Sequence, residues 1–157
     1  MRSIRPAFFG LALLGACASH SQLDTVIVLR ESAPQFAWNS SGAVRLDINR
    51  DGAQDAAFLG HDDDVVALGV VLGGPIPRLA LLQFRQRGNA QLGVCSEALG
   101  LTVERQSAMP ELAFGTPVPG YDVCDACFEL RVLESEPCDP LYIFWNREVD
   151  DLDWWRT

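Results

Sequence analysis

Hydrophobic and polar residues alternate along most of the chain after residue 23, which is the pattern of strands with one buried face. This pattern predicts strands over 24–30, 43–47, 64–72, 78–85, 90–95, 99–104, 128–133, 141–145 and 151–156. Turn residues predict hairpins around 60–64, 87–89 and 134–140, and an irregular stretch over 106–121. No convincing helical periodicity runs over ten or more residues in this part. The sequence therefore predicts a mainly β protein, with a single antiparallel β-rich domain over 23–157 that has hairpins and little helix.

The segment 1–16 has the parts of a secretory signal peptide, an N-terminal helix that is cleaved from the mature protein. Arg2 and Arg5 precede an apolar run that is too short to cross a hydrocarbon core of roughly 30 Å. The residues Leu-Gly-Ala before Cys17 then resemble the lipobox of bacterial lipoproteins. This resemblance implies that Cys17 carries lipid, that the chain is anchored to a membrane through it, and that 17–22 is a polar tether.

The residue after the lipidated cysteine decides the destination in that family, because an Asp there retains a lipoprotein at the inner membrane. This chain has Ala18 at the position. The resemblance therefore implies a lipid-anchored protein of the cell envelope, on the outer membrane where the cell has one, facing the periplasm or the surface.

Charge narrows the range of partners. The chain has 157 residues, with 12 Lys and Arg against 21 Asp and Glu, and a net charge of −9. An acidic surface repels phosphates, so the sequence excludes nucleic acid as a partner. An envelope protein or a glycan remains possible.

Four cysteines besides Cys17 predict two disulfides in an exported chain: Cys95, Cys124, Cys127 and Cys138. Three pairings exist, and we favour Cys127 with Cys138 and Cys95 with Cys124. The C-x-x-C at 124–127 is also the spacing of thioredoxin-like redox sites, but a strand pattern follows it where those sites open a helix. Four cysteines can also hold zinc, although a second C-x-x-C is missing.

One motif carries metal chemistry. Residues 47–55 read D-x-N-x-D-G-x-x-D, so that oxygen-bearing side chains recur at alternate positions around a glycine, Gly52, that permits a sharp turn. Oxygen ligands in this number suit Ca²⁺, and carboxylates so close together repel one another without a cation. We expect a structural Ca²⁺ site formed by Asp47, Asn49, Asp51, the carbonyl of Ala53, and Asp55.

The loop differs from an EF-hand, because Phe58 stands where the bidentate Glu belongs and strand patterns flank it. It more closely resembles the calcium loops of FG-GAP and VCBS-type repeats, in which D-x-N-x-D-G-x-x-D lies between strands. One copy is present, which excludes a full propeller. The acidic turn Asp62–Asp64 is expected to close a hairpin, and a ligand from it to the same ion is the alternative.

The C-terminal segment is rich in tryptophan. Trp154 and Trp155 must point to opposite faces of a strand, so that one fills the core and the other lies near the surface, where it could stack on a sugar or a protein. The W-N and W-W-R residues at 145–146 and 154–156 resemble a C-terminal pattern of uncharacterised bacterial lipoproteins, which implies no activity.

These features predict a calcium-stabilised, disulfide-bonded envelope lipoprotein that is a structural or binding module and not an enzyme. One alternative is a hydrolase of envelope glycans with paired carboxylates from 62–64 or 150–153, which requires a pocket with two carboxylates and aromatic platforms. Another is an inhibitor or partner of an envelope protein that docks through the Trp-bearing sheet edge.

Overall fold

The computed structural model describes residues 20–86, 93–95, 99–107, 109–112, 115–135 and 138–156. The described part is mainly β, as predicted, with one helix, α1 (His20–Ser32). The strands are β1 (Ala37–Trp38), β2 (Val44–Leu46), β3 (Asp55–Asp62), β4 (Val65–Leu72), β5 (Arg78–Gln86), β6 (Gly93–Val94), β7 (Gly100–Arg105), β8 (Glu111–Leu112), β9 (Thr116–Pro117), β10 (Phe128–Leu133), β11 (Leu141–Asn146) and β12 (Asp151–Trp155).

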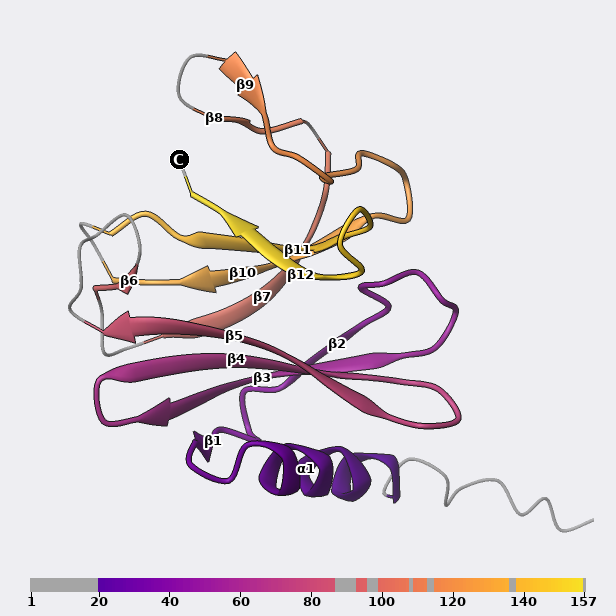
Figure 1. The fold of residues 1–157 in the computed structure, drawn as a ribbon, viewed down its shortest axis with the longest axis vertical. Coiled ribbons are helices and arrows are strands. Elements are labelled where there is room, and N and C mark those ends of the chain that lie inside the picture. The colour runs from indigo at the N-terminus through magenta and orange to yellow at the C-terminus, as the bar shows by residue number, and fades with distance from the viewer. Residues whose placement is uncertain are drawn as a thin grey trace, which may run out of the picture.

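The strands form two main sheets that lie one above the other (Figure 1). The first sheet has the order β1-β3-β4-β5-β6, with β2 also paired to β3. The second sheet has the order β12-β11-β10-β7, and β8 and β9 form a small separate ladder. All pairs are antiparallel except β5 with β6.

The largest hydrophobic core lies between the two sheets, where alternate residues of each strand meet. Leu68 and Val70 of β4 belong to the same buried cluster as Leu130 and Val132 of β10. Burial of such side chains contributes roughly 1.5–3 kcal/mol each. This core fixes which residues of the second sheet face outward, and the outward residues include Glu129, which becomes important below.

Helix α1 covers the opposite face of the first sheet (Figure 1). Leu29 is fully buried there against Phe58 of β3 and Val71 of β4. The central strands are therefore buried on both faces, which explains why β4 is a continuous apolar run instead of an alternating one. The molecule thus has three layers, a helix and two sheets.

The predicted strand over 24–30 is wrong, because these residues belong to α1. β-branched residues in the segment favour a strand locally, but Val26, Leu29 and Ala33 have the spacing of one helical face, and all three pack against the first sheet. Burial of that face outweighs the weak preference of the β-branched residues. The helix ends at Ser32, two residues before Pro34, which lacks the N–H needed to continue it.

The predicted hairpin from 78–85 to 90–95 is also wrong. Gly93 pairs with Arg85 in parallel orientation, so that β6 lies alongside β5 in the same direction and cannot follow it through a tight turn. The turn residues 87–89 lie outside the described residues. The hairpins β3–β4 and β10–β11 and the last strand, β12, are confirmed.

The predicted signal peptide 1–16 and the lipid-bearing Cys17 lie outside the described residues. The last three residues of the predicted tether, 20–22, belong to the first turn of α1. Among the residues that the structure describes, no helix has the length and apolar character needed to cross a membrane.

Candidate functional site

The acidic loop between β2 and β3 folds inward around its own backbone. Both carboxylate oxygens of Asp47 accept loop amides, one from Asp51 at 3.1 Å and one from Gly52 at 3.0 Å. The Oδ1 atom of Asn49 accepts the same Asp51 amide, also at 3.1 Å. The side chains of Asp47 and Asn49 therefore both bend back to the same loop amide, that of Asp51.

The backbone makes the sharp turn that the motif predicts. Gly52 has a φ of 87° and Arg50 a φ of 59°, both in the left-handed region. Only glycine adopts this region freely, so Arg50 is held there at some cost. The turn places Asp47, Asn49 and Asp51 around one side of the loop.

Asp51 has a well-bonded carboxylate. Its Oδ1 accepts the amide of Ala53 at 2.7 Å, and its Oδ2 accepts the side-chain amide of Asn49 at 3.0 Å. The Ala53 hydrogen bond, and after it the Asn49 hydrogen bond, lower the pKa of Asp51. Asp51 is therefore an anionic oxygen donor at neutral pH.

Asp55 begins β3 and closes the base of the loop. It is fully buried, and it accepts the amides of Ile48 and Gly73, each at 2.8 Å. Burial raises the pKa of this carboxyl, and the negative charges of Asp51 and Asp47 raise the pKa further. A cation near these three carboxylates would offset the repulsion between them.

The donor set fits Ca²⁺ in chemical type, with three carboxylates and one amide oxygen on adjoining positions. Among the described residues, the carboxylates of Asp47, Asp51 and Asp55 do not all lie within 4.8 Å of one another. Their oxygens accept backbone amides and, at Asp51 Oδ2, the side-chain amide of Asn49 instead. The structure therefore brings the predicted ligands to one loop, while their convergence on a single point is part of the proposal below.

The alternative ligand from the acidic turn is excluded by topology. Asp62 ends β3 and Val65 begins β4, so this turn lies at the far end of the strand that Asp55 begins. An eight-residue strand spans about 23 Å, far beyond the reach of one coordination sphere. Asp63, with a φ of 41°, simply closes the β3–β4 hairpin.

The four cysteines form two disulfides, but the pairing that we favoured from the sequence is wrong. Cys95 bonds to Cys138, and Cys124 bonds to Cys127. A turn in which the Cys127 amide donates to the Cys124 carbonyl at 3.1 Å brings the second pair together locally. The Glu134 carboxylate lies beside Cys95 and Cys138 and pairs with Arg156, so this group offers no free thiolate to zinc.

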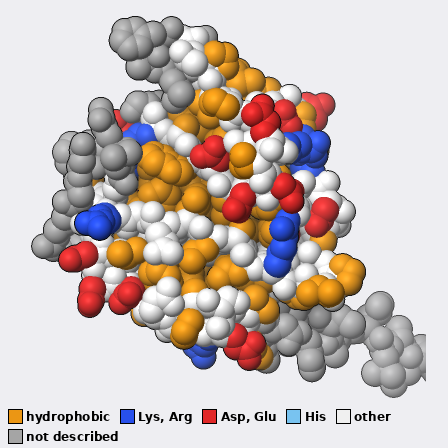
Figure 2. Space-filling model, viewed as in Figure 1, with side chains coloured by type: hydrophobic (Ala, Val, Ile, Leu, Met, Phe, Trp, Pro, Cys, Tyr) orange, Lys and Arg blue, Asp and Glu red, His pale blue; other side chains and the backbone are white. Residues whose placement is uncertain are grey.

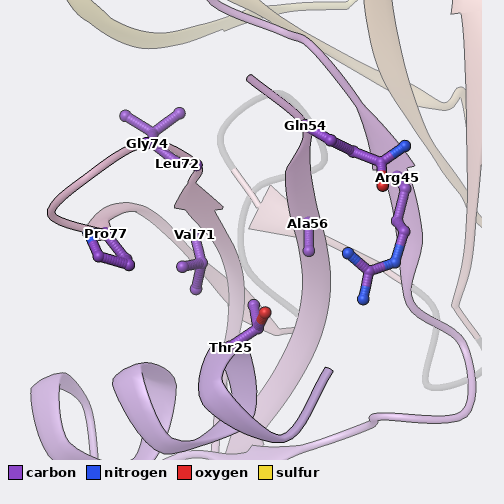
Figure 3. A pocket seen from close by; sticks show the side chains of 9 residues that line it. Thr25, Arg45, Gln54, Ala56, Val71, Leu72, Gly74 and Pro77 are labelled. Carbon is purple, nitrogen blue, oxygen red and sulfur yellow. The ribbon is translucent and has the colours of Figure 1, made fainter. Parts of the chain in front are cut away.

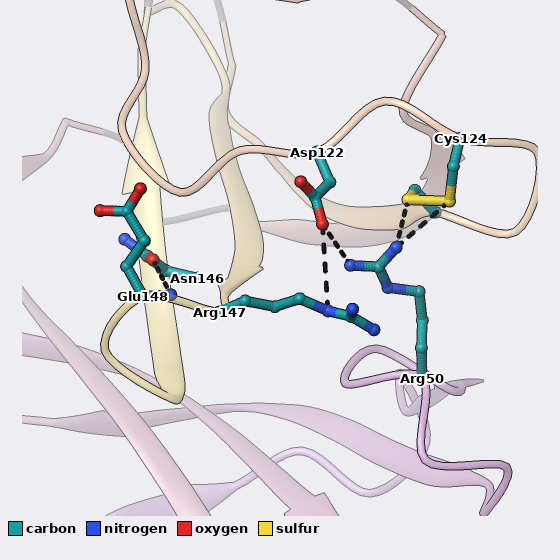
Figure 4. Close-up of polar contacts among 7 residues, drawn as sticks. Arg50, Asp122, Cys124, Asn146, Arg147 and Glu148 are labelled. Atoms are coloured by element: carbon teal, nitrogen blue, oxygen red, sulfur yellow. Dashed lines mark hydrogen bonds and ion pairs between the residues drawn. A yellow bond between two sulfur atoms is a disulfide. The ribbon is translucent and has the colours of Figure 1, made fainter.

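Arg50 joins the acidic loop to the second disulfide (Figure 4). Its Nη1 donates to both sulfur atoms, at 3.0 Å to Cys127 and 3.3 Å to Cys124. Its Nη2 donates to the Asp122 carboxylate at 2.5 Å. Sequence reasoning missed this contact, since 74 positions separate Arg50 from Cys124 and no local pattern joins them.

A groove on the outer face of the second sheet is the other candidate site. It has a volume of about 260 Å³. The outward side chains of Glu104, Glu129, Tyr142 and Trp155 line it. Arg105, Ser107, Met109, Pro110 and Tyr121 complete the lining. Figure 2 shows hydrophobic side chains gathered over the region of β10–β12.

Aromatic rings make up much of this groove. Tyr142 and Trp155 are cross-strand partners whose rings stack with centroids 4.1 Å apart. Tyr121 meets the Trp155 ring edge-on at 6.3 Å. Trp154 points to the other face and packs against Phe84 in the core. The prediction that the two tryptophans face opposite sides of β12 is therefore confirmed.

Two carboxylates lie beside these rings. Glu104 and Glu129 are directly opposite each other on β7 and β10. Glu104 forms an ion pair with Arg131 at 2.9 Å, while Glu129, only 5% exposed, accepts the hydroxyl of Tyr121 at 2.9 Å. Burial raises the pKa of Glu129, although its hydrogen bonds oppose this shift. Burial likewise raises the pKa of the Tyr121 hydroxyl, with Glu129 adding to the shift.

The indole of Trp155 completes the polar side of the groove. Its Nε1 is buried and makes no well-aligned hydrogen bond among the described atoms. It lies near enough to the Glu129 carboxylate to lower the pKa of that group. Alternation along β10, β11 and β12 predicts that Glu129, Tyr142 and Trp155 face outward. Alternation alone cannot show that these residues line the same groove.

The acidic residues that the glycan-hydrolase alternative used lie elsewhere. Asp62–Asp64 close a hairpin, and Asp150, in the turn before β12, lies 3.6 Å from the Arg78 guanidinium. Asp153 accepts the side-chain amide of Asn146 at 3.0 Å. Neither set provides the paired carboxylates beside aromatic rings that this alternative needs, whereas Glu104 and Glu129 do.

A second cavity, of about 200 Å³, lies between α1 and the first sheet (Figure 3). Thr25 enters it from α1, Arg45 from β2, and Gln54 from the end of the acidic loop. The rest of its lining is small or apolar, and it holds no carboxylate. This cavity therefore holds no candidate catalytic or metal-binding group.

Comparison of the chain with family models, with curated proteins and with solved structures finds no significant match.

Proposed function

We propose that this chain is an exported, lipid-anchored binding module of the bacterial envelope that takes a saccharide in the groove of its second sheet. Its β-rich domain is stabilised by Ca²⁺ in the loop 47–55 and by two disulfides. The observation that carries the proposal is the groove itself, in which stacked aromatic rings lie beside two carboxylates.

The chemistry of the groove suits a sugar ring. Aromatic faces and edges, here from the partly exposed Tyr142 and Trp155, pack against the apolar C–H faces of sugars. Carboxylates such as those of Glu104 and Glu129 accept hydrogen bonds from hydroxyl groups. A volume of about 260 Å³ restricts the ligand to a small unit, such as one ring of a longer chain.

The layer order suits an anchored receptor. Lipid on Cys17 would lie three residues before His20, where α1 begins on the outer side of the first sheet. The groove lies on the opposite outer face, that of the second sheet. An anchor next to α1 therefore leaves the groove on the face of the domain opposite the anchored helix.

Calcium is supported by the loop geometry. Asp47 and Asn49 point into the loop, and Asp55 is a buried carboxylate beside the charges of Asp47 and Asp51. When bound, Ca²⁺ would be held by Asp47, Asn49, Asp51, the Ala53 carbonyl and Asp55, and would neutralise their mutual repulsion. To bind the ion, some of these oxygen atoms would give up their hydrogen bonds to backbone amides and coordinate Ca²⁺ instead.

Saccharide binding is tested by titrating the chain with soluble N-acetylglucosamine oligomers while following tryptophan fluorescence. We expect a saturable change that Trp155→Ala and Glu129→Ala each weaken about tenfold, which corresponds to about 1.4 kcal/mol. Glu148→Gln, an exposed carboxylate outside the groove, serves as the matched control and should leave the affinity unchanged. Equal affinities for all four proteins would refute the groove as the site.

A glycan hydrolase in the same groove is the second candidate, because two carboxylates and aromatic platforms now share one pocket. The raised pKa of Glu129 suits a general acid. Release of new reducing ends from the same oligomers, lost in Glu129→Gln, would favour the hydrolase, whereas binding without cleavage favours the module.

Docking of a partner protein through the Trp-bearing edge has less support. Trp154 and Trp155 are both partly buried, and neither belongs to the strongly exposed large hydrophobic residues of the described part.

A further inference from the structure

The disulfide Cys124–Cys127 has a cation placed against both of its sulfur atoms. The Nη1 atom of Arg50 lies 3.0 Å from the sulfur of Cys127 and 3.3 Å from that of Cys124 (Figure 4). Arg50 holds a left-handed backbone conformation in the acidic loop to reach this position. A guanidinium in this place has a larger effect on the reduced form of the pair than on the oxidised form.

The reason is the difference in charge between the two states. A disulfide sulfur is neutral and a weak hydrogen-bond acceptor, whereas a thiolate carries a full negative charge. An adjacent Arg stabilises the thiolate and makes a cysteine more reactive. Arg50 therefore favours opening of this bond, and it replaces the helix N-terminus that redox sites often use and that this segment lacks.

Neighbouring charges adjust the effect. Asp122 accepts a hydrogen bond from the Nη2 atom of Arg50. Its negative charge partly offsets the positive charge that the guanidinium presents to the sulfur atoms. Arg147, whose Nε lies 3.9 Å from the same carboxylate, partly neutralises Asp122 in turn. Asp125, between the two cysteines, is exposed and opposes a thiolate through solvent only weakly. Two guanidinium groups thus share one close carboxylate near the sulfurs.

The two cysteines differ in exposure. Cys127 is only 1% exposed, while Cys124 is partly exposed. An incoming thiolate therefore reaches Cys124 first. Cys127 becomes the leaving group, and it is the sulfur that lies nearer to Arg50.

We expect the fold to persist when this bond opens. Three positions separate Cys124 from Cys127, whereas 43 separate Cys95 from Cys138. A disulfide that closes a shorter loop stabilises the folded state less. The Cys127 amide also donates to the Cys124 carbonyl at 3.1 Å, and the Cys127 carbonyl accepts the Gln106 amide at 2.9 Å, so backbone bonds hold the turn as well.

We propose that Cys124–Cys127 is a thiol–disulfide exchange site whose partner is a dithiol reductant, while Cys95–Cys138 is a structural crosslink. A thiolate of the reductant attacks the Cys124 sulfur, the Cys124–Cys127 bond breaks, and Cys127 leaves as a thiolate beside Arg50. The second thiolate of the reductant then attacks the reductant sulfur of the mixed disulfide. This releases the Cys124 thiolate, which takes a proton from water. The reductant becomes a disulfide, and two electrons enter the Cys124–Cys127 pair.

The experiment equilibrates the full chain in calcium-containing buffers with graded ratios of reduced to oxidised dithiothreitol. Acid quenching, alkylation of free thiols and peptide mass spectrometry then report each pair separately. We expect Cys124–Cys127 to open at a ratio at least about tenfold lower than Cys95–Cys138, which is about 30 mV for a two-electron couple. The second pair is the internal control in every sample.

Three variants separate the role of Arg50 from a general disturbance of the loop. Arg50→Gln should require an about tenfold higher ratio for half-opening of Cys124–Cys127, and Arg50→Lys should recover part of that shift. Asp122→Asn should move the midpoint in the opposite direction, because it frees the guanidinium without altering the loop. None of these variants should change the midpoint of Cys95–Cys138.

Two results would overturn the proposal. One is opening of both pairs at the same ratio in the unaltered chain. The other is an unchanged Cys124–Cys127 midpoint in both Arg50→Gln and Asp122→Asn, with circular dichroism showing that the variants fold.

Discussion

Asp55 and Glu129 are both buried carboxyl groups, but their surroundings differ. Each set of surroundings indicates which kind of ligand the site would bind. Asp55 has two backbone donors but faces the charges of Asp47 and Asp51. Glu129 has a tyrosine hydroxyl, with one arginine and one glutamate acting on it from a distance. The first arrangement is the basis for the proposed cation, and the second is the basis for the proposed neutral polar ligand. The two sites therefore call for different tests.

Asp51→Ala tests the calcium site at the level of one ligand. A bound ion at 100 times its dissociation constant stabilises the fold by about 2.7 kcal/mol, which the variant should lose. We expect its melting temperature in calcium to fall close to the value that the unaltered chain has in chelator. The measurement is thermal unfolding with added calcium and with chelator.

The control for that experiment is Asp64→Ala, which removes an acidic group from the turn at the opposite end of β3. It should keep the full response to calcium. If the unaltered chain melts at the same temperature with and without chelator, the loop binds no stabilising ion.

Glu129→Gln tests the buried carboxyl through the pH dependence of stability. Burial raises the pKa of Glu129 in the folded state, so the folded protein binds this proton more tightly than the unfolded chain. Stability from this group is full below the ordinary pKa of a glutamate and declines as the pH rises through the raised value. The neutral glutamine keeps an acceptor for Tyr121 and removes this decline.

The free energy of unfolding of Glu129→Gln, relative to the unaltered chain, should therefore increase with pH, by about 1.4 kcal/mol per unit of pKa elevation. Urea unfolding between about pH 4 and pH 8 measures it. A flat difference for Glu129→Gln would contradict the assigned environment.

At the level of elements, the sequence pattern located most strands but not their partners. Alternation identifies β7, β10, β11 and β12 because each has one face in the core. It cannot distinguish the parallel β5–β6 pair from a hairpin, since pairing direction depends on where the chain returns. The segment 24–30 is helical because its apolar side chains bury the outer face of β3 and β4. The residues that expose this apolar face belong to β3 and β4, so the pattern within 24–30 alone cannot predict the helix. Likewise the oxygen-bearing residues of the loop formed a recognisable sequence motif, while the groove depends on the register of four strands.

Gly69→Ala tests how closely α1 and β1 pack on the first sheet. A Cβ atom at Gly69 would lie 2.8 Å from the Trp38 ring and 2.9 Å from a Leu29 methyl group. Such overpacking costs about 1–3 kcal/mol, because the two large side chains must shift together. Chemical denaturation should show that loss as a lower midpoint.

Gly100→Ala is the matched control for this change. It is also a strand glycine, but its added methyl group would meet its nearest neighbours in Leu133 at 3.6 Å, an ordinary contact distance. We expect stability equal to or slightly above that of the unaltered chain. A Gly69→Ala variant as stable as this control would mean that the helix layer lies farther from the sheet than the structure has it.

At the level of the whole molecule, the three layers separate the tasks that we assign to the protein. Helix α1 follows the predicted anchor, the first sheet carries the acidic loop at the junction of β2 and β3, and the second sheet carries the groove. Arg50 links the loop to the segment before β10 through Asp122 and the disulfide. A conformational change in the loop would therefore act directly on the segment that leads into the second sheet.

Cys17→Ser tests the anchor on which the orientation of the groove depends. Each buried CH₂ group of an acyl chain contributes roughly 0.8 kcal/mol, so several chains on Cys17 hold a protein at the membrane in practice permanently. Without the sulfur no lipid can be attached, and the protein expressed in a bacterium should move from the membrane fraction to the soluble fraction. Ala18→Asp keeps the lipid and should stay with membranes, moving only from the outer to the inner one. Retention of Cys17→Ser on membranes would show that something other than lipid holds the chain there, and the argument that the groove faces away from the anchor would lose its premise.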